Sequence, residues 1–226
     1  MTAALLTGVA YHNRFLQDDA FISFRYARNL AQGRGLVFNA GERVEGITNL
    51  LWAVILAAIA KLGAAPEVSS QALGLTAFFA TLLAVQALAE ELAPESGVAA
   101  AFFCGLNYTF SAYATSGLET STQALAFTLL VLLFARAERC GWSISRCAGL
   151  SALAGAALWL RLDSAIPVAV IGGYALVRAR KDPKRALALV IPCALLVGSL
   201  VAFKLTYYGD VLPNTFYAKT DSHSWE

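Results

Sequence analysis

Apolar runs separated by short charged turns dominate the chain after residue 50. The longest charge-free runs are 72–89 and 186–203, each close to the ~20 apolar residues that a transmembrane helix needs. Further apolar runs lie at 3–10, 50–60, 98–114, 125–135, 148–160 and 167–177. The pattern predicts an all-α fold: a polytopic helical membrane protein with about seven to eight membrane segments, some of them short or re-entrant.

The segment 18–52 has a different pattern, in which charged and apolar residues share one short helix and two turns. Apolar side chains recur at helical spacing, at Phe21, Ile22, Phe24, Ala27 and Leu30, while Arg25 and Arg28 fall on another face. This spacing predicts an amphipathic helix over 20–32 that lies on the membrane surface. Gly33 is expected to end it, because glycine readily adopts the left-handed conformation found after helices.

Basic residues in the loops orient the membrane segments. Loops 136–146 and 178–185 carry clusters of Arg and Lys, which favour the cytoplasmic side. The polar segments 18–19, 115–120, 161–163 and 207–210 are then all expected on the external face. The apolar runs between residues 49 and 115 are odd in number, whereas an even number of crossings is required. The short run 50–60 is therefore expected to be half-buried or re-entrant.

Composition narrows the functional class. Hydrophobic residues make up 58% of the 226 residues and charged residues only 14%, whereas soluble domains are about 45–50% apolar and about 25% charged. The net charge of +2 and the confinement of basic residues to loops argue against a nucleic-acid partner. The expected surrounding of most of the chain is the lipid bilayer.

Asp18 and Asp19 are the first candidates for chemistry. A carboxylate at a helix start commonly caps the helix, and this is the simpler interpretation of either residue. Paired carboxylates at a membrane surface also suit a general base, with the second one shaping the local field or holding a divalent metal. The sequence does not choose between the two residues.

Other polar residues are expected on the same face, each with a structural alternative. Glu45 could pair with Arg43 or Arg25 at the surface, and Asn49 or Thr48 could cap the next helix. Ionisable groups near membrane depth are usually functional, and a guanidinium suits a phosphate. The candidate substrate-binding residues are therefore Arg25, Glu45, Asn49, Glu119, Arg161, Asp163, Tyr208 and Asp210, and no residue is assigned as a metal ligand.

The segment DDAFISFRYARNLAQGRGLVFNAGERVEGITNLLW, at 18–52, resembles the first external loop of bacterial integral-membrane glycosyltransferases of the C superfamily (GT-C). TSGLET, RLDS and YYGDVLPNTFYAK follow in that order and are similar to segments of its terminal arabinofuranosyltransferase-like or mannosyltransferase-like branch. Family members are usually longer. The resemblance thus implies that 1–226 is the N-terminal part of one transmembrane glycosyltransferase domain, with an external catalytic loop at 18–48, membrane segments at 49–206 and an external segment at 207–226.

The resemblance also implies an activity. It points to an enzyme of the bacterial cytoplasmic membrane, with its active face outward, that moves a sugar from a polyprenyl-phosphate donor to a cell-envelope glycan or protein. The catalytic base of the superfamily is an aspartate of the first external loop, which here is Asp18 or Asp19. Glu119, Arg161 and Asp163 would line the same cavity, with Arg161 on the phosphate. Some members use a divalent cation and others do not, so Mg²⁺ or Mn²⁺ is left open.

A transporter or flippase for a lipid-linked or anionic substrate is the alternative from another class. It would also place carboxylates and an arginine in a polar cavity. It predicts charges near the middle of the bilayer and an inverted internal repeat. The sequence contains no such repeat, and its charges gather at one expected surface, which favours the enzyme.

Overall fold

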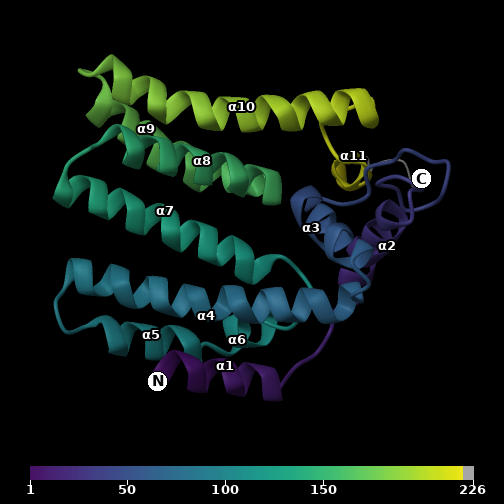
Figure 1. The fold of residues 1–226 in the computed structure, drawn as a ribbon, viewed down its shortest axis with the longest axis horizontal. Coiled ribbons are helices and arrows are strands. Elements are labelled where there is room, and N and C mark those ends of the chain that lie inside the picture. The colour runs from purple at the N-terminus through teal and green to yellow at the C-terminus, as the bar shows by residue number, and fades with distance from the viewer. Residues whose placement is uncertain (221–226) are drawn as a thin grey trace.

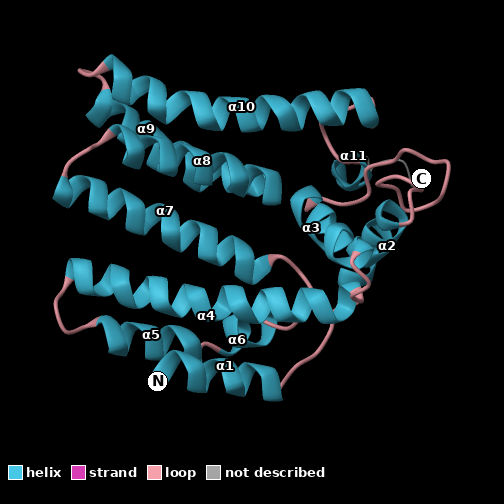
Figure 2. Ribbon diagram, in the orientation of Figure 1, coloured by secondary structure: helices cyan, strands magenta, loops and turns pink. Residues whose placement is uncertain are grey.

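The computed structural model describes residues 1–220, and every regular element in this range is helical. The longer helices are α4 (Pro66–Leu92), α7 (Thr120–Cys140), α8 (Ile144–Leu160), α9 (Ala165–Ala179) and α10 (Pro183–Tyr207). The shorter ones are α1 (Thr2–His12), α2 (Ala20–Ala31), α3 (Leu50–Lys61), α5 (Gly97–Leu106), α6 (Tyr108–Tyr113), the 3-10 turn η1 (Leu162–Ser164) and α11 (Asn214–Thr220). The all-α prediction is confirmed (Figure 2). The end of the expected external segment, 221–226, lies outside the described residues.

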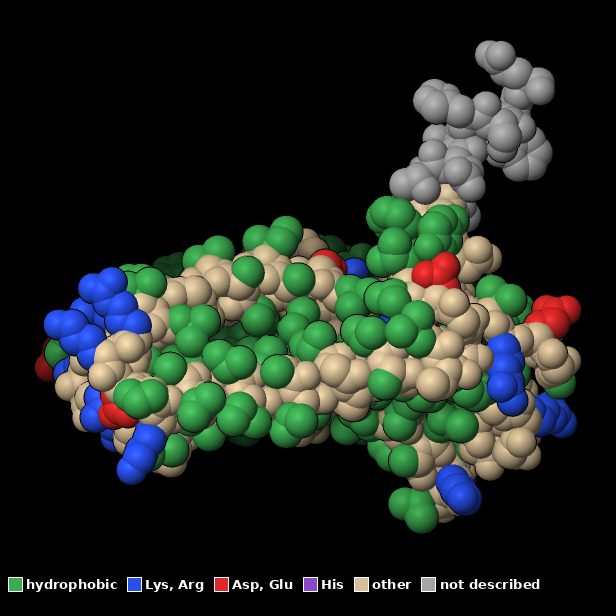
Figure 3. Space-filling view, turned by 90° about the horizontal axis from the view of Figure 1, so that it is seen from above, with side chains coloured by type: hydrophobic (Ala, Val, Ile, Leu, Met, Phe, Trp, Pro, Cys, Tyr) green, Lys and Arg blue, Asp and Glu red, His purple; other side chains and the backbone are tan. Residues whose placement is uncertain are grey.

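The helices form a bundle with a cap at one end (Figure 1). The bundle consists of α1, α4, α5, α7, α8, α9 and α10 running side by side, whereas α2 and α3 pack together beyond the end of α8. We call this the cap end, and the opposite end, which carries the α4–α5, α7–α8 and α9–α10 loops, the basic end. Figure 3 shows a cluster of Lys and Arg side chains at the basic end and hydrophobic side chains along the flank.

Helix lengths confirm a polytopic helical membrane protein. Among the described residues, 4 helical segments are long and apolar enough to cross a bilayer: Pro66–Leu92, Thr120–Cys140, Leu162–Ala179 and Pro183–Tyr207. Shorter apolar helices are α3, α5 and α8. The 12 residues of α3 extend only about 18 Å, less than the ~30 Å hydrocarbon core. α3 also lies in the cap (Figure 1), which favours the expectation that 50–60 does not span, although α5, with 10 residues, is shorter still.

The expected continuous run 98–114 is instead divided between α5 and α6. Asn107 takes an extended conformation, with φ −61° and ψ 114°, and its side chain accepts a hydrogen bond from Phe110 N at 2.9 Å. An asparagine side chain that bonds its own backbone competes with the helix. The prediction of one uninterrupted segment was wrong for this reason.

The amphipathic helix is confirmed as α2, which buries one face in the cap. Phe24 packs with Trp52 of α3 and with Leu160 of α8 in a hydrophobic cluster. The Trp52 indole donates a hydrogen bond of 3.0 Å to the backbone oxygen of Gly117, so this buried aromatic leaves no polar atom unpaired. Gly117 has φ +87°, and a Cβ there would lie 2.9 Å from Phe24. Glycine is therefore required where this turn meets α2.

The expected external segments all meet at the cap end. Gln17 N donates to Ser116 O at 2.9 Å, Arg161 Nη1 lies 2.7 Å from Glu119 Oε1, and the Tyr208 hydroxyl donates to Leu36 O at 2.7 Å. The basic loops 136–146 and 178–185 lie at the opposite end (Figure 1). The segregation of charge that the sequence predicted is therefore present in the fold.

Close packing of α4 against the end of α6 yields the first prediction. A Cβ at Gly74 would lie 2.3 Å from the backbone oxygen of Ala114, which cannot rotate away. We expect Gly74→Ala to destabilise the protein by about 1–3 kcal/mol, the usual cost of overpacking. Thermal unfolding in detergent micelles measures this. Gly149→Ala in α8, where a Cβ meets nothing within 4 Å, is the matched control, and an equal Tm for the two variants would contradict the packing argument.

Candidate active site

A pocket of 300 Å³ opens at the cap end between α2, the segment that precedes α3, the start of α7 and the end of α8. Among its lining residues are four that the sequence singled out, Asp19, Asn49, Glu119 and Arg161. The others are Ile22, Ser23, Gly46, Ile47, Thr48, Leu118 and Thr215. We call it the Glu119 pocket. Its volume is at the lower bound of the ~300–1,000 Å³ usual for small-molecule sites.

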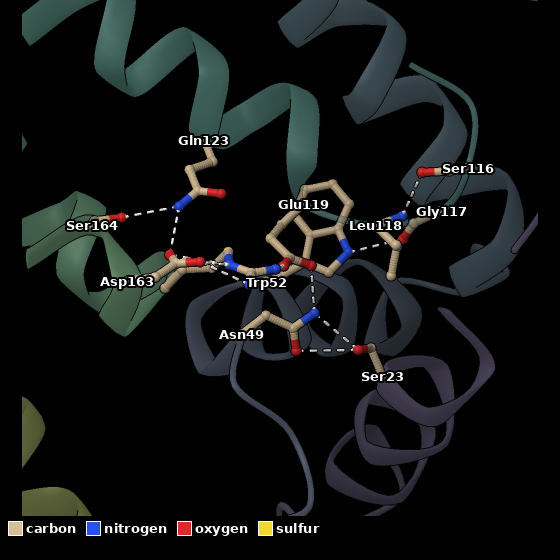
Figure 4. A network of polar contacts seen from close by, with 11 residues as sticks. Ser23, Asn49, Trp52, Ser116, Gly117, Leu118, Glu119, Gln123, Asp163 and Ser164 are labelled. Carbon is tan, nitrogen blue, oxygen red and sulfur yellow. Dashed lines mark hydrogen bonds and ion pairs between the residues drawn. The ribbon is translucent and has the colours of Figure 1, made fainter. Parts of the chain in front are cut away.

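Glu119 is the buried centre of this pocket, with only 1% of its surface exposed. A buried carboxylate must be paired and hydrogen-bonded to persist. Oε1 lies 2.7 Å from Arg161 Nη1, and Oε2 accepts from Asn49 Nδ2 at 2.5 Å (Figure 4). Asn49 also exchanges a hydrogen bond with Ser23 of α2, at 3.1 Å. Asn49 holds the N-cap position of α3 but makes no side-chain cap, because its amide serves Glu119 and Ser23.

Arg161 follows α8 and faces two carboxylates. Its Nη2 lies 2.8 Å from Asp163 Oδ2, and Gln123 Nε2 holds the other oxygen of Asp163 at 2.7 Å (Figure 4). Burial acts to lower the pKa of Arg161, but the hydrogen bonds with Asp163 and Glu119 outweigh it and raise the pKa above its ordinary value. The guanidinium therefore stays positive. Each terminal nitrogen carries two N–H groups, so one on each remains for a ligand.

The two aspartates of the first loop have different positions. Asp19 holds the N-cap position of α2, yet its side chain makes no capping hydrogen bond. The first turn is closed by backbone bonds alone, such as Ile22 N to Asp19 O at 3.2 Å. Asp19 lines the Glu119 pocket, whereas Asp18 does not. Geometry thus separates two residues that the sequence left equivalent.

Glu45, Tyr208 and Asp210 line a separate pocket of 220 Å³, which we call the Glu45 pocket. The expected pairing of Glu45 with Arg43 or Arg25 was wrong, since Glu45 Oε1 lies 2.7 Å from Lys204 Nζ. Both side chains are almost fully buried, at 4% and 2% exposure. Burial raises the pKa of Glu45, and the neighbouring Lys204 ammonium partly offsets this.

Arg25 lines neither of these two pockets. Its Nε donates to Phe38 O at 2.8 Å, its Nη2 donates to Asn39 Oδ1 at 3.0 Å, and the guanidinium stacks on the Phe38 ring at 4.1 Å. These contacts fasten the loop after α2 and do not point to a ligand. Sequence reasoning missed Lys204 and Ser23. The signals were a single cation near the end of an apolar run and a small polar residue on the apolar side of α2.

Few carboxylates of the Glu119 pocket are free to bind a divalent metal. Within residues 1–220 no group of three or more His, Cys, Asp or Glu side chains is arranged to hold a metal ion. In the Glu119 pocket both oxygens of Glu119 are already engaged, which leaves Asp19 as the one further carboxylate. Mg²⁺ is usually held by one or two carboxylates together with waters and substrate phosphates, so Asp19 would supply one ligand to a cation that arrives with a phosphate. The steps below use only the side chains of this protein.

The buried ion pair yields the second prediction. We expect Glu119→Ala to destabilise the protein by about 1–3 kcal/mol, because Arg161 Nη1 and Asn49 Nδ2 lose their acceptor and keep only Asp163 and Ser23 as partners of these two side chains. The matched variant Asp163→Ala removes a side chain that is 55% exposed, and its expected cost is about 0–1 kcal/mol. Equilibrium unfolding in detergent compares the two. Equal losses would show that burial does not decide the strength of this cluster.

Comparison with known proteins is consistent with an enzyme site. The chain is 28% identical to a terminal beta-(1->2)-arabinofuranosyltransferase of Mycobacterium tuberculosis, over 96% of this chain and 37% of that protein. It is also 28% identical to the Corynebacterium glutamicum protein of the same name, over 97% of this chain and 36% of that protein. No family model matches the chain, and no solved structure matches it. The chain is thus similar, over nearly its whole length, to known arabinofuranosyltransferases, and it spans a little over a third of their length.

Proposed function

We propose that this protein is a membrane glycosyltransferase that moves a sugar from a polyprenyl-phosphate donor to a cell-envelope glycan or protein. One observation carries the proposal: the Asp19 carboxylate and the Arg161 guanidinium line the same pocket at the end of a bundle of membrane-length helices. An acid–base group and a cation in one cavity are what transfer from a phosphate ester needs. The similarity to arabinofuranosyltransferases makes arabinofuranose the first sugar to test.

Asp19 is the proposed general base. Its carboxylate is exposed at the pocket and engaged in no capping bond, so it is available to accept a proton from an acceptor hydroxyl. The hydroxyl oxygen then forms a bond to the anomeric carbon while the bond from that carbon to the phosphate oxygen breaks. The electron pair leaves with the polyprenyl phosphate, and the proton remains on Asp19.

Arg161 is the proposed phosphate contact. One N–H on each of its terminal nitrogens is free of Glu119 and Asp163, and the rigid fork of a guanidinium suits a phosphate oxygen pair. Glu119 and Asp163 hold the guanidinium in place from two sides. Their negative charge also lowers the affinity of the site for the released phosphate, which would assist product release.

The remaining parts of the proposal concern the lipid. A cavity of 480 Å³ between α8, α9 and α10 is lined almost entirely by apolar side chains and offers space for part of a prenyl chain. The basic end carries the Arg and Lys clusters, which by the positive-inside rule would face the cytoplasm. The Glu119 pocket would then lie at the external surface of the bacterial cytoplasmic membrane.

A transporter or flippase is the competing function. Such a protein places its substrate site near the middle of the bilayer between discontinuous helices. The helix break between α5 and α6 contributes no residue to the Glu119 pocket or the Glu45 pocket. Both polar pockets lie at the cap end, which favours surface chemistry over passage through the bundle.

The proposal yields the third prediction. Sugar transfer from polyprenyl-phosphate arabinofuranose is measured in membranes of cells that express either the wild-type protein or one variant. Asp19→Asn should lower the rate by about 10²–10⁴-fold, the usual contribution of a general base. Asp18→Asn should retain most of the activity, because Asp18 does not line the pocket. Glu42→Gln, on the exposed loop, controls for expression and insertion.

Each contrary outcome has a definite meaning. Loss of activity in Asp18→Asn alone would transfer the role of base to Asp18. Full activity in both variants would remove the paired aspartates from the chemistry. If the wild-type protein moved a labelled polyprenyl-phosphate sugar across the membrane but transferred no sugar, the transporter hypothesis would replace the enzyme hypothesis.

A further inference from the structure

The Glu45 pocket has no role in the mechanism above. Its 220 Å³ are lined by Arg43, Val44, Glu45, Tyr208, Asp210, Leu212, Asn214 and Tyr217. Both acidic and basic side chains reach it, and a volume below the ~300–1,000 Å³ of drug-sized sites suits one small ring. The pocket is polar, so its ligand must form hydrogen bonds.

Glu45 is the unusual residue of this pocket. It is 4% exposed, and its oxygen Oε2 accepts no hydrogen bond from any residue within 1–220. Lys204 Nζ lies 2.7 Å from the other oxygen, Oε1, and also donates to Val211 O at 3.1 Å. A buried carboxylate oxygen without a donor is costly. A ligand hydroxyl in the pocket would supply the missing hydrogen bond.

Arg43 complements Glu45 across the same pocket. Its guanidinium lies 5.0 Å from the Tyr207 ring centroid, and it makes no ion pair among the described residues. Its N–H groups are therefore available to a ligand oxygen. Asp210, by contrast, is occupied: its Oδ1 accepts from Val211 N at 2.6 Å, and its Oδ2 accepts from the Tyr217 hydroxyl at 2.8 Å. Glu45 and Arg43 thus form an acceptor–donor pair.

The charges of the pocket balance. Lys204 compensates Glu45 at 2.7 Å, and Arg43 and Asp210 line the pocket with opposite charges. A neutral polyol would meet both donors and acceptors here, and the balanced charges give no net attraction for an ion. This pattern favours a carbohydrate over an anion or an apolar chain.

A single layer of backbone separates the Glu45 pocket from the Glu119 pocket. Glu45 lines one and Gly46 the other, and likewise Asn214 lines one and Thr215 the other. Asn214 N donates to Glu45 O at 2.9 Å, which joins these two segments into one partition. The two pockets therefore lie on opposite sides of this partition, next to one another at the cap end.

We propose that the Glu45 pocket binds a sugar unit of an acceptor glycan, with Glu45 Oε2 accepting a hydrogen bond from one ring hydroxyl and Arg43 donating to a neighbouring oxygen. This inference rests on the proposed transferase and narrows its acceptor from a glycan or protein to a glycan. Glu45 and Arg43 are binding residues here and take no part in the proton transfer at Asp19.

The fourth prediction tests this subsite with an arabinofuranose disaccharide as acceptor probe. Arg43→Gln and Glu45→Gln should each raise the acceptor KM by roughly tenfold, the usual effect of one hydrogen bond to a charged group, with kcat within about twofold of wild type. The double variant Glu45→Gln/Lys204→Gln removes both buried charges, and it is included because Glu45→Gln alone leaves Lys204 unpaired. Glu42→Gln, which does not line the pocket, is the matched control.

A direct binding measurement separates the two proposals. Saturation-transfer NMR with the same disaccharide on detergent-solubilised protein should detect binding to wild type and to Asp19→Asn, and a much weaker signal for Arg43→Gln and the double variant. Binding of this pattern without sugar transfer by wild type would overturn the proposed enzyme and keep the glycan site. An unchanged KM and an unchanged signal in the pocket variants would overturn the subsite, as would a fall in kcat at constant KM.

Discussion

The buried ion pair between Glu119 and Arg161 is the contact on which the cap end depends. Glu119 is 1% exposed, and a carboxylate in that position persists only when it is paired and hydrogen-bonded. Its two oxygens are met by Arg161 after α8 and by Asn49 before α3, and Asn49 in turn reaches Ser23 of α2. One charge thereby fixes four separate parts of the chain. The pocket exists because these parts meet at that carboxylate.

The position of this pair follows from the physics of a membrane bundle. Helices surrounded by lipid gain little from the hydrophobic effect when they associate, so close packing and polar contacts hold them together. Along the bundle close packing is common: a Cβ at Gly155 would lie 2.8 Å from Leu196. A polar contact also occurs there, since Cys193 N of α10 donates to Ser151 Oγ of α8 at 2.9 Å, beside Pro192. At the cap end the polar contacts include this ion pair. A charge costs less free energy there, because the helices end and the partners of the buried Glu119, such as Arg161, are partly exposed.

The two polar pockets therefore combine rigidity with unsatisfied groups. Arg161, Asn49 and Glu119 are locked by one another, whereas the Asp19 carboxylate makes no cap and Glu45 Oε2 has no donor within the described residues. A site in which some groups are held and others are open is preorganised for a ligand. The partition made by Asn214 N and Glu45 O places the two pockets back to back. The sugar unit proposed for the Glu45 pocket would therefore bind close to the proposed reaction site.

Periodicity and charge alone determined the helical class, the amphipathic helix α2 and the placement of the basic loops opposite the polar segments. These features depend on local spacing and on the cost of charge in lipid. The residue types of the candidate site were also visible in the sequence. What the sequence could not determine was pairing: it left Asp18 and Asp19 equivalent, assigned Glu45 to the wrong partner and missed Lys204. Only the tertiary structure decides which side chains share a cavity, since Glu119 meets Asn49 and Glu45 meets Lys204 across long stretches of chain. Such contacts are set by how whole helices pack, and no local pattern records that packing.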